Sequence, residues 1–200
     1  MSRTVCDGNA SLINMTPTPL IETARMRLEP LEDRDQDAVF HVYSNPDVVR
    51  LFGQDCMTEV AHARYWMDVQ DRMRQLDLGA TWVLRLKDSG AAAGTFSFDG
   101  INRQWHNVGI SYALHSDYWR RGLMSEALAT MIAFAWSGML AGPMHRIQAL
   151  VYQENLASTA LLRKAGFVQE GRRLGLVFWQ QRYWDLDSYC LINPADVPLG

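Results

Sequence analysis

Residues 111–128 read SYALHSDYWRRGLMSEAL, and they join a strand to a helix through a short basic loop. The apolar strand ends near Leu114, and a helix begins at about Gly122. The start of a helix leaves several backbone N–H groups without partners, so it attracts anions. Gly122 has no Cβ and lets the backbone approach a phosphate closely, while Arg120 and Arg121 add full positive charges. The stretch therefore predicts a loop that binds phosphate groups.

A second interpretation of this loop stays open. The same residues are compatible with an ordinary strand-to-helix turn that carries two solvated arginines, and the local pattern favours neither interpretation. The segments on either side have to decide between the two.

Strand and helix patterns alternate along the rest of the chain, with no internal repeat. A strand–helix–strand passage from about 108 to 152 predicts a right-handed crossover between two parallel strands. We expect strands at 24–31, 82–86, 94–98, 108–114, 146–152, 167–170 and 183–192, and helices at 33–43, 59–76, 122–136 and 156–165.

The composition predicts one α/β domain that lies in the cytoplasm. The 200 residues are 48% hydrophobic and 20% charged, which is typical of a chain that buries a substantial core. The N-terminus lacks the basic-then-apolar order of a secretory signal, and no apolar run reaches the ~20 residues that cross a bilayer. We therefore expect no membrane partner. We expect residues 1–19 to form a flexible leader and residues 20–195 to form the domain, with Met1 or Met15 as the natural start.

Charge and cysteine usage narrow the function classes further. The formal net charge is −3, so no global positive field is available to bind nucleic acid, and none is expected as a partner. The three cysteines lie far apart in the sequence, and the five histidines form no i, i+4 pair. We expect free thiols in a reducing compartment and no metal site.

Two stretches together resemble the GNAT acetyltransferase superfamily. Its acyl-CoA loop has the pattern R/Q-x-x-G-x-G/A, and here Trp119 and Met124 replace the first and last residues of that pattern. Residues 119–128 are instead similar to the Rim-type ribosomal-protein N-terminal acetyltransferases, in which a Trp precedes a basic-Gly-aliphatic-Met run and Glu-Ala-Leu. Residues 149–171, ALVYQENLASTALLRKAGFVQEG, resemble the A-x-V-x-x-x-N-x-x-S-x-x-L-x-x-x-G-F-x-x-E-G pattern of the same branch.

This resemblance covers residues 24–192 and implies both the fold and the cosubstrate. The implied fold is a mixed, mostly antiparallel sheet of six or seven strands, flanked by helices, with a central parallel pair that splays apart. Acetyl-CoA is the implied cosubstrate, with pantetheine in the gap between the parallel strands and the pyrophosphate on the basic loop. The implied cofactor-binding residues are Leu114, Arg120, Arg121, Gly122, Leu123, Met124, Ser125, Asn155 and Ser158.

Asn155 and Ser158 have two interpretations. They stand three residues apart at the start of a predicted helix, where both residue types are favoured as caps. The resemblance implies instead that Asn155 binds the pantetheine arm and that Ser158 donates a proton to the departing thiolate. Many superfamily members use a tyrosine for that step, but one turn further along this helix stand Leu161 and Leu162.

The general base is the least defined part of the predicted site. Glu170 follows the Gly-Phe step and is our candidate, whereas Asp185 and Asp187 near the last strand are alternatives. Acidic residues at strand ends are usually solvated, and a water chain is a further alternative. The sequence therefore predicts Ser158 and Glu170 as the catalytic pair.

The sequence predicts transfer of an acetyl group to a primary amine, by direct attack in a ternary complex. The acceptor is either the α-amine of a peptide or protein or a small amine, and the sequence does not distinguish them. A non-catalytic acyl-CoA-binding module is an alternative, because no base is evident, and a scaffold that binds no CoA is a third hypothesis. The aromatic-rich closing strands are compatible with a homodimer.

Overall fold

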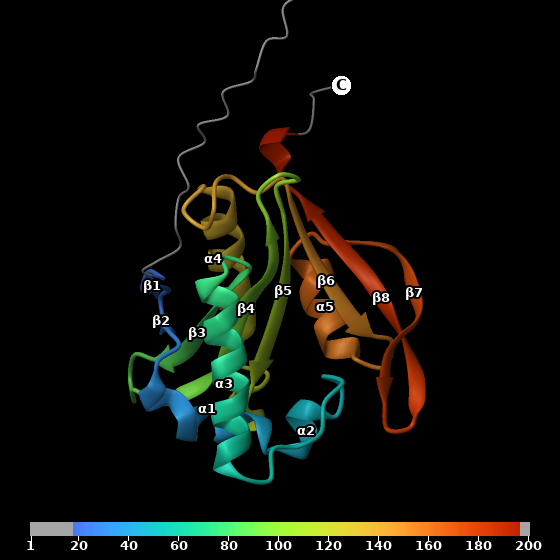
Figure 1. Ribbon diagram of the computed structural model, residues 1–200. Helices are drawn as coiled ribbons and strands as arrows, with labels where there is room; N and C mark the ends of the chain where they lie inside the picture. Colours follow the sequence, from blue (N-terminus) through green and yellow to red (C-terminus); the bar gives the residue numbers. More distant parts are fainter. Residues whose placement is uncertain (1–17, 197–200) are drawn as a thin grey trace, which may run out of the picture.

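The computed structural model describes residues 18–196, in which one mixed sheet has the strand order β1-β2-β3-β4-β5-β6-β8-β7 (Figure 1). Neighbouring strands are antiparallel except for β5 and β6, which are parallel. The strands are β1 (Ile21–Glu22), β2 (Met26–Pro30), β3 (Gly79–Leu86), β4 (Ala92–Asn102), β5 (Asn107–Leu114), β6 (Arg146–Tyr152), β7 (Val168–Trp179) and β8 (Arg182–Ile192). The predicted fold class is confirmed. The described part of the sheet has eight strands, one more than the upper expectation, because the two-residue β1 also pairs.

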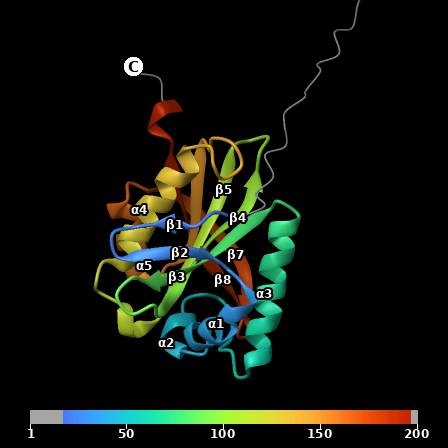
Figure 2. The same ribbon diagram turned by 90° about the vertical axis from the view of Figure 1, so that its left-hand side faces the viewer.

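Helices cover both faces of the sheet (Figures 1 and 2). The α-helices are α1 (Gln36–Tyr43), α2 (Pro46–Val49), α3 (Val60–Gln75), α4 (Leu123–Trp136) and α5 (Leu156–Lys164). We call the face packed against α4 and α5 the α5 face, and the face packed against α1 and α3 the α3 face. None of the helices within residues 18–196 is long and apolar enough to cross a membrane.

The main core lies on the α5 face. Helix α4 places Leu128 and Met131 against the sheet, and both side chains are fully buried. Trp82 on β3 lies among them, and its indole Nε1 donates a hydrogen bond to the carbonyl of Pro19 at 2.8 Å. Pro19 belongs to the predicted leader, of which residues 1–17 lie outside the described residues. A smaller cluster on the α3 face includes Val39, Val42, Tyr43, Ala63, Met67 and Ala113.

The largest difference from the predicted elements is at β7. We expected a short strand at 167–170, but β7 runs from Val168 to Trp179 and pairs with β8 at both ends, with a register shift between Arg173 and Val177. Most of its side chains are exposed, so the two-residue alternation of a half-buried strand is missing. The turn between β7 and β8 is Gln180–Gln181 with both φ angles positive, whereas such turns usually carry Asn or Gly. Neither the strand nor its turn therefore has a readable sequence signal.

We predict that Leu128→Ala lowers the free energy of unfolding by about 2–5 kcal/mol, because it leaves a cavity in the core under α4. Urea denaturation followed by circular dichroism measures this loss. The control is Leu174→Ala on β7, where the side chain is 78% exposed and the expected change is within about 0.5 kcal/mol. Equal losses in the two variants would contradict this packing.

Candidate functional site

The parallel strands β5 and β6 open into a gap. Their pairing ends with Gly109 opposite Gln148, although β5 continues to Leu114 and β6 to Tyr152. The outer neighbours β4 and β8 remain paired with them to those ends. The separation is therefore confined to one seam of the sheet, as the predicted splaying required (Figure 1).

The backbone of β5 presents polar groups to this gap. The N–H of His115 donates to the carbonyl of Ala93 on the β4 side at 2.8 Å. Antiparallel pairing alternates, so the N–H and C=O groups of Leu114 and Tyr112 point away from β4 and toward β6. The carbonyl of Leu114 accepts a hydrogen bond from the indole Nε1 of Trp119 at 2.6 Å. The backbone of Tyr112 is thus aimed into the gap beyond the last residue pair.

The predicted basic loop leads directly from the gap to α4. Gly122 is the N-cap of α4 and has a φ of 74°, a left-handed conformation that glycine adopts without strain. Arg120 is also left-handed, with a φ of 60°. Both Arg120 and Arg121 are exposed, and neither forms an ion pair within residues 18–196. Two uncompensated positive charges therefore flank the helix N-terminus.

Arg25 fastens the loop to the edge of the sheet. Its Nη1 donates to the carbonyl of Arg121 at 2.8 Å, and its Nε forms an ion pair with Glu126 at 2.6 Å. The side chains of Leu123 and Met124 are buried in the core, so these residues can offer only backbone N–H groups to a ligand. The half-buried Ser125 follows them in the first turn of α4.

The first turn of α5 lies across the gap from β5. The Oδ1 of Asn155 accepts a hydrogen bond from the N–H of Ser158 at 3.0 Å, so the capping interpretation holds for Asn155. The hydroxyls of Ser158 and Tyr112 lie 2.7 Å apart. Burial raises the pKa of Tyr112 to about 12, so this phenol stays protonated at neutral pH.

Tyr112 is a site residue that the sequence reasoning missed. One turn beyond Ser158, α5 carries Leu161 and Leu162, and the structure instead brings a tyrosine from β5 to Ser158. Side chains alternate between the two faces of a strand, so Ile110, Tyr112 and Leu114 lie on one face, and this alternation is visible in the sequence. The partner Ser158 depends on how α5 returns over the gap, and no local pattern encodes that.

The predicted base Glu170 is held in an ion pair. Its carboxylate pairs with Arg146 and accepts a hydrogen bond from Ser188 at 3.0 Å. The hydrogen bond from Arg146 lowers the pKa of Glu170. Arg146 is the first residue of β6, so Glu170 lies at the closed end of the gap.

The two alternative acids also have partners. Asp187 pairs with Arg172 at 2.8 Å, and Asp185 accepts a hydrogen bond from the N–H of Gly175 at 2.8 Å. The geometry therefore does not single out a base among the predicted acids.

Within residues 18–196 there is no group of three or more His, Cys, Asp or Glu that could hold a metal ion.

The open end of the gap is bordered by the segment that links α2 to α3. The indole Nε1 of Trp179 donates to Asp55 of that segment at 2.9 Å. Gly53 approaches the hydroxyl of Tyr152 so closely that a Cβ there would collide with it. The Tyr152 hydroxyl is buried and has no hydrogen-bond partner within the described chain.

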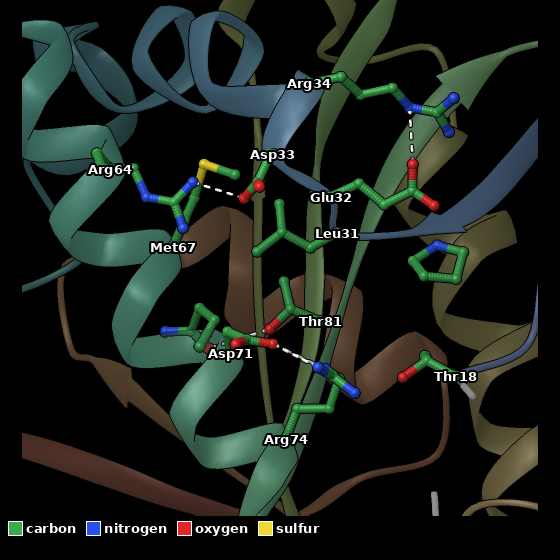
Figure 3. Close-up of a pocket in the computed structure, with 12 residues that line it drawn as sticks. Thr18, Leu31, Glu32, Asp33, Arg34, Arg64, Met67, Asp71, Arg74 and Thr81 are labelled. Carbon is green, nitrogen blue, oxygen red and sulfur yellow. Dashed lines mark hydrogen bonds and ion pairs between the residues drawn. The ribbon is translucent and has the colours of Figure 1, made fainter. Parts of the chain in front are cut away.

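A separate cavity of about 650 Å³ lies between α3 and strands β2 and β3, away from the gap in the strand order (Figure 3). Its charged side chains neutralise one another, since Arg64 pairs with Asp33 at 2.6 Å and Arg74 with Asp71 at 2.6 Å. The cavity thus lacks the uncompensated charge that distinguishes the basic loop.

Comparison with known proteins follows the same geometry. Residues 25–168 match the family model described as acetyltransferase (GNAT) domain. The chain is 27% identical over 178 residues to the uncharacterized N-acetyltransferase YoaA of Bacillus subtilis, which covers 89% of this chain and 99% of that protein.

Two solved structures share the fold. One is an acetyltransferase from Salmonella typhimurium that modifies the N-terminal serine of ribosomal protein L7/L12, with a TM-score of 0.78, 18% identity and coverage of 88% of this chain and 99% of that one. The other is spermidine N-acetyltransferase from Vibrio cholerae in complex with CoA and spermine, with a TM-score of 0.72, 15% identity and coverage of 84% and 95%. The family match, the mixed sheet with its opened parallel pair and the basic helix start agree, and the chain belongs to the GNAT family as an N-acetyltransferase that uses acetyl-CoA.

Proposed function

We propose that this enzyme transfers the acetyl group of acetyl-CoA to a primary amine by direct attack in a ternary complex. The acceptor is the α-amine of a peptide or protein, or a small amine. The observation that carries the proposal is the gap between β5 and β6, which leads from the Tyr112 backbone to the N-terminus of α4. Direct attack needs no covalent enzyme intermediate. It requires both substrates to be bound at once, and the gap between β5 and β6 is open to both.

The chain's own residues fit acetyl-CoA. The amide groups of pantetheine can pair with the backbone of Tyr112 as an added strand would. The pyrophosphate then meets the backbone N–H groups that follow Gly122, at Leu123, Met124 and Ser125. Arg120 and Arg121 contribute positive charges. The carbonyl of Leu114 already accepts a hydrogen bond from Trp119, so Leu114 can offer only its backbone N–H. All of these residues, Leu114 included, form the proposed cofactor-binding set.

On the α5 face, Ser158 is the proposed proton donor to the departing thiolate. Its hydroxyl lies 2.7 Å from that of Tyr112, which can replace the proton that Ser158 gives up. The Oδ1 of Asn155 is used by the helix cap, so its Nδ2 group is the atom offered to the pantetheine arm. Tyr112 is thus a positioning residue that acts through Ser158.

The surroundings of the gap bear on the acceptor. Asp55 and Trp179 border the open end, and a carboxylate there favours the approach of a cationic amine. Of the two enzymes with related structures, the one from Salmonella typhimurium acts on the N-terminus of a ribosomal protein, and the one from Vibrio cholerae acts on the polyamine spermidine. On β7 and β8, Leu174, Phe178 and Tyr183 are largely exposed, and this apolar surface supports the proposal of a homodimer.

One observation favours the alternative of a non-catalytic acyl-CoA-binding module. The ion pair with Arg146 makes Glu170 a weak base, because protonating it would break that pair. The module would bind acetyl-CoA but would acetylate no amine, whereas a scaffold would not bind it at all. Measurements of acetyl-CoA binding and of amine acetylation together separate the three hypotheses.

We predict that Gly122→Glu abolishes most acetyl-CoA binding, with a loss of at least about 100-fold in affinity, measured by isothermal titration calorimetry. The variant places a negative charge beside the pyrophosphate and strains a φ of 74°. The control is Gly100→Glu, which makes the same change at a φ of 60° at an exposed position of β4, where the register with β5 shifts, and should bind as the wild type does. A wild type that binds no acetyl-CoA supports the scaffold hypothesis.

We predict that Ser158→Ala lowers kcat by about 10²-fold while the Kd for acetyl-CoA stays the same, because the departing thiolate loses its proton donor. Intact-mass spectrometry of a panel of peptides and small amines identifies an acceptor, and CoA release then gives the rates. Binding of acetyl-CoA by the wild type without acetylation of any amine would instead establish the non-catalytic module.

A further inference from the structure

Ser111 and Asp99 form a hydrogen-bonded pair on the α3 face of the sheet. The Oγ of Ser111 donates to Oδ2 of Asp99 at 2.7 Å, across the β4–β5 pairing. Side chains alternate along a strand, so Ser111 points away from the α5 face to which its neighbour Tyr112 points. Ala113 lies two residues after Ser111, so its side chain is on the same face, and it packs against α1 and α3.

The pair lies beside the closed end of the gap. Asp99 stands directly opposite Gly109, which is the last residue of β5 paired with β6. Ser111 lies two residues further along β5, where the strands have separated. Ser111 therefore belongs to the separated part of β5, and its side chain lies on the face opposite the one that Tyr112 and Ser158 share.

The Asp99 carboxylate has room on both sides. The residues directly opposite it are Gly79 on β3 and Gly109 on β5, so neither of these two positions places a side chain against it, and its contact from β5 comes from Ser111. Within residues 18–196 it forms no ion pair, in contrast to Glu170. The residue is half-buried.

The electrostatics of this position suit a proton acceptor. Burial raises the pKa of Asp99, and the hydrogen bond from Ser111 opposes that shift only in part. The negative charge of Asp99 contributes to the raised pKa of Tyr43 on α1. In the adjacent loops, Asp77 and Arg103 pair with each other at 3.7 Å. A carboxylate without a cation holds a proton more readily than one in an ion pair.

We propose that the Ser111–Asp99 pair accepts the proton that the acceptor amine loses before it attacks acetyl-CoA. The ammonium gives a proton to the Oγ of Ser111 while the hydroxyl proton of Ser111 passes to Asp99, and the neutral amine attacks the thioester carbon. The C–N bond forms, the C–S bond breaks, and the thiolate takes its proton from Ser158 on the other face. The acetylated nitrogen releases its remaining extra proton to solvent.

This inference rests on the proposed function and gives the missing base a position. Asp99 acts through Ser111, so it is a positioning residue and proton store, whereas Ser111 is the group that meets the amine. Placing the acceptor's base and the thiolate's acid on opposite faces keeps the two proton transfers separate.

The test compares acceptors of different basicity in the wild type, Asp99→Asn and the control Asp71→Asn on α3. For a strongly basic amine, we expect Asp99→Asn to lower kcat/KM by about 10²-fold or more, because that amine must be deprotonated. For a weakly basic amine that is already neutral at the assay pH, we expect the loss to shrink by about 10-fold or more. Asp71→Asn should match the wild type for both amines.

Two further readouts exclude a structural explanation. Asp99→Asn keeps the hydrogen bond from Ser111 and removes a buried charge, so it should unfold at the same or a higher temperature and bind acetyl-CoA normally. Equal losses for both amines, or a variant as active as the wild type, would overturn this inference alone. A wild type that acetylates neither amine, with acetyl-CoA bound, would overturn the proposed function itself.

Discussion

The site is built around the separation of β5 from β6. Buried backbone N–H and C=O groups cost about 1–3 kcal/mol each when they lack partners, so two strands rarely part inside a sheet without compensation. Here β4 holds β5, and β8 holds β6, beyond the point where their mutual pairing ends at Gly109 and Gln148. The helices α4 and α5 each begin after one of the two separated strands, so both helix starts lie at the open end of the gap.

This arrangement gives the two faces of the gap different chemistry. On the α5 face, the hydroxyls of the half-buried Tyr112 and Ser158 lie in hydrogen-bond contact and can deliver a proton. On the α3 face, the Ser111–Asp99 pair lies near the closed end, and Asp99 has no ion-pair partner among residues 18–196. Glu170, the acid that the sequence suggested, belongs instead to an ion pair that ties β7 to the start of β6. Among residues 18–196 the sheet thus carries one acid, Glu170, in an ion pair and another, Asp99, without one.

Elements with strong periodicity could be predicted from the sequence, and those held by pairing alone could not. The strand at 108–114, helix α4 and strand β6 have clear patterns because each buries an apolar face, so the parallel crossover was predictable. The end of β7 was missed because its side chains are mostly exposed. At the site, Gly122 and the arginines were visible as a local motif. Tyr112 was not, because its partner Ser158 comes from the distant helix α5. Asp99 was not, because its contact with Ser111 depends on the exact register between β4 and β5.

We propose that acetyl-CoA lies in the gap between β5 and β6 and pairs with the backbone of β5. Hydrogen exchange measured by NMR with and without acetyl-CoA tests it most directly, since the amide of Tyr112 faces the gap. Acetyl-CoA is expected to slow exchange at Tyr112 and at the amides of residues 123–125, while those of β3 stay unchanged. Protection confined to the cavity between α3 and β3, with Tyr112 unaffected, would contradict it.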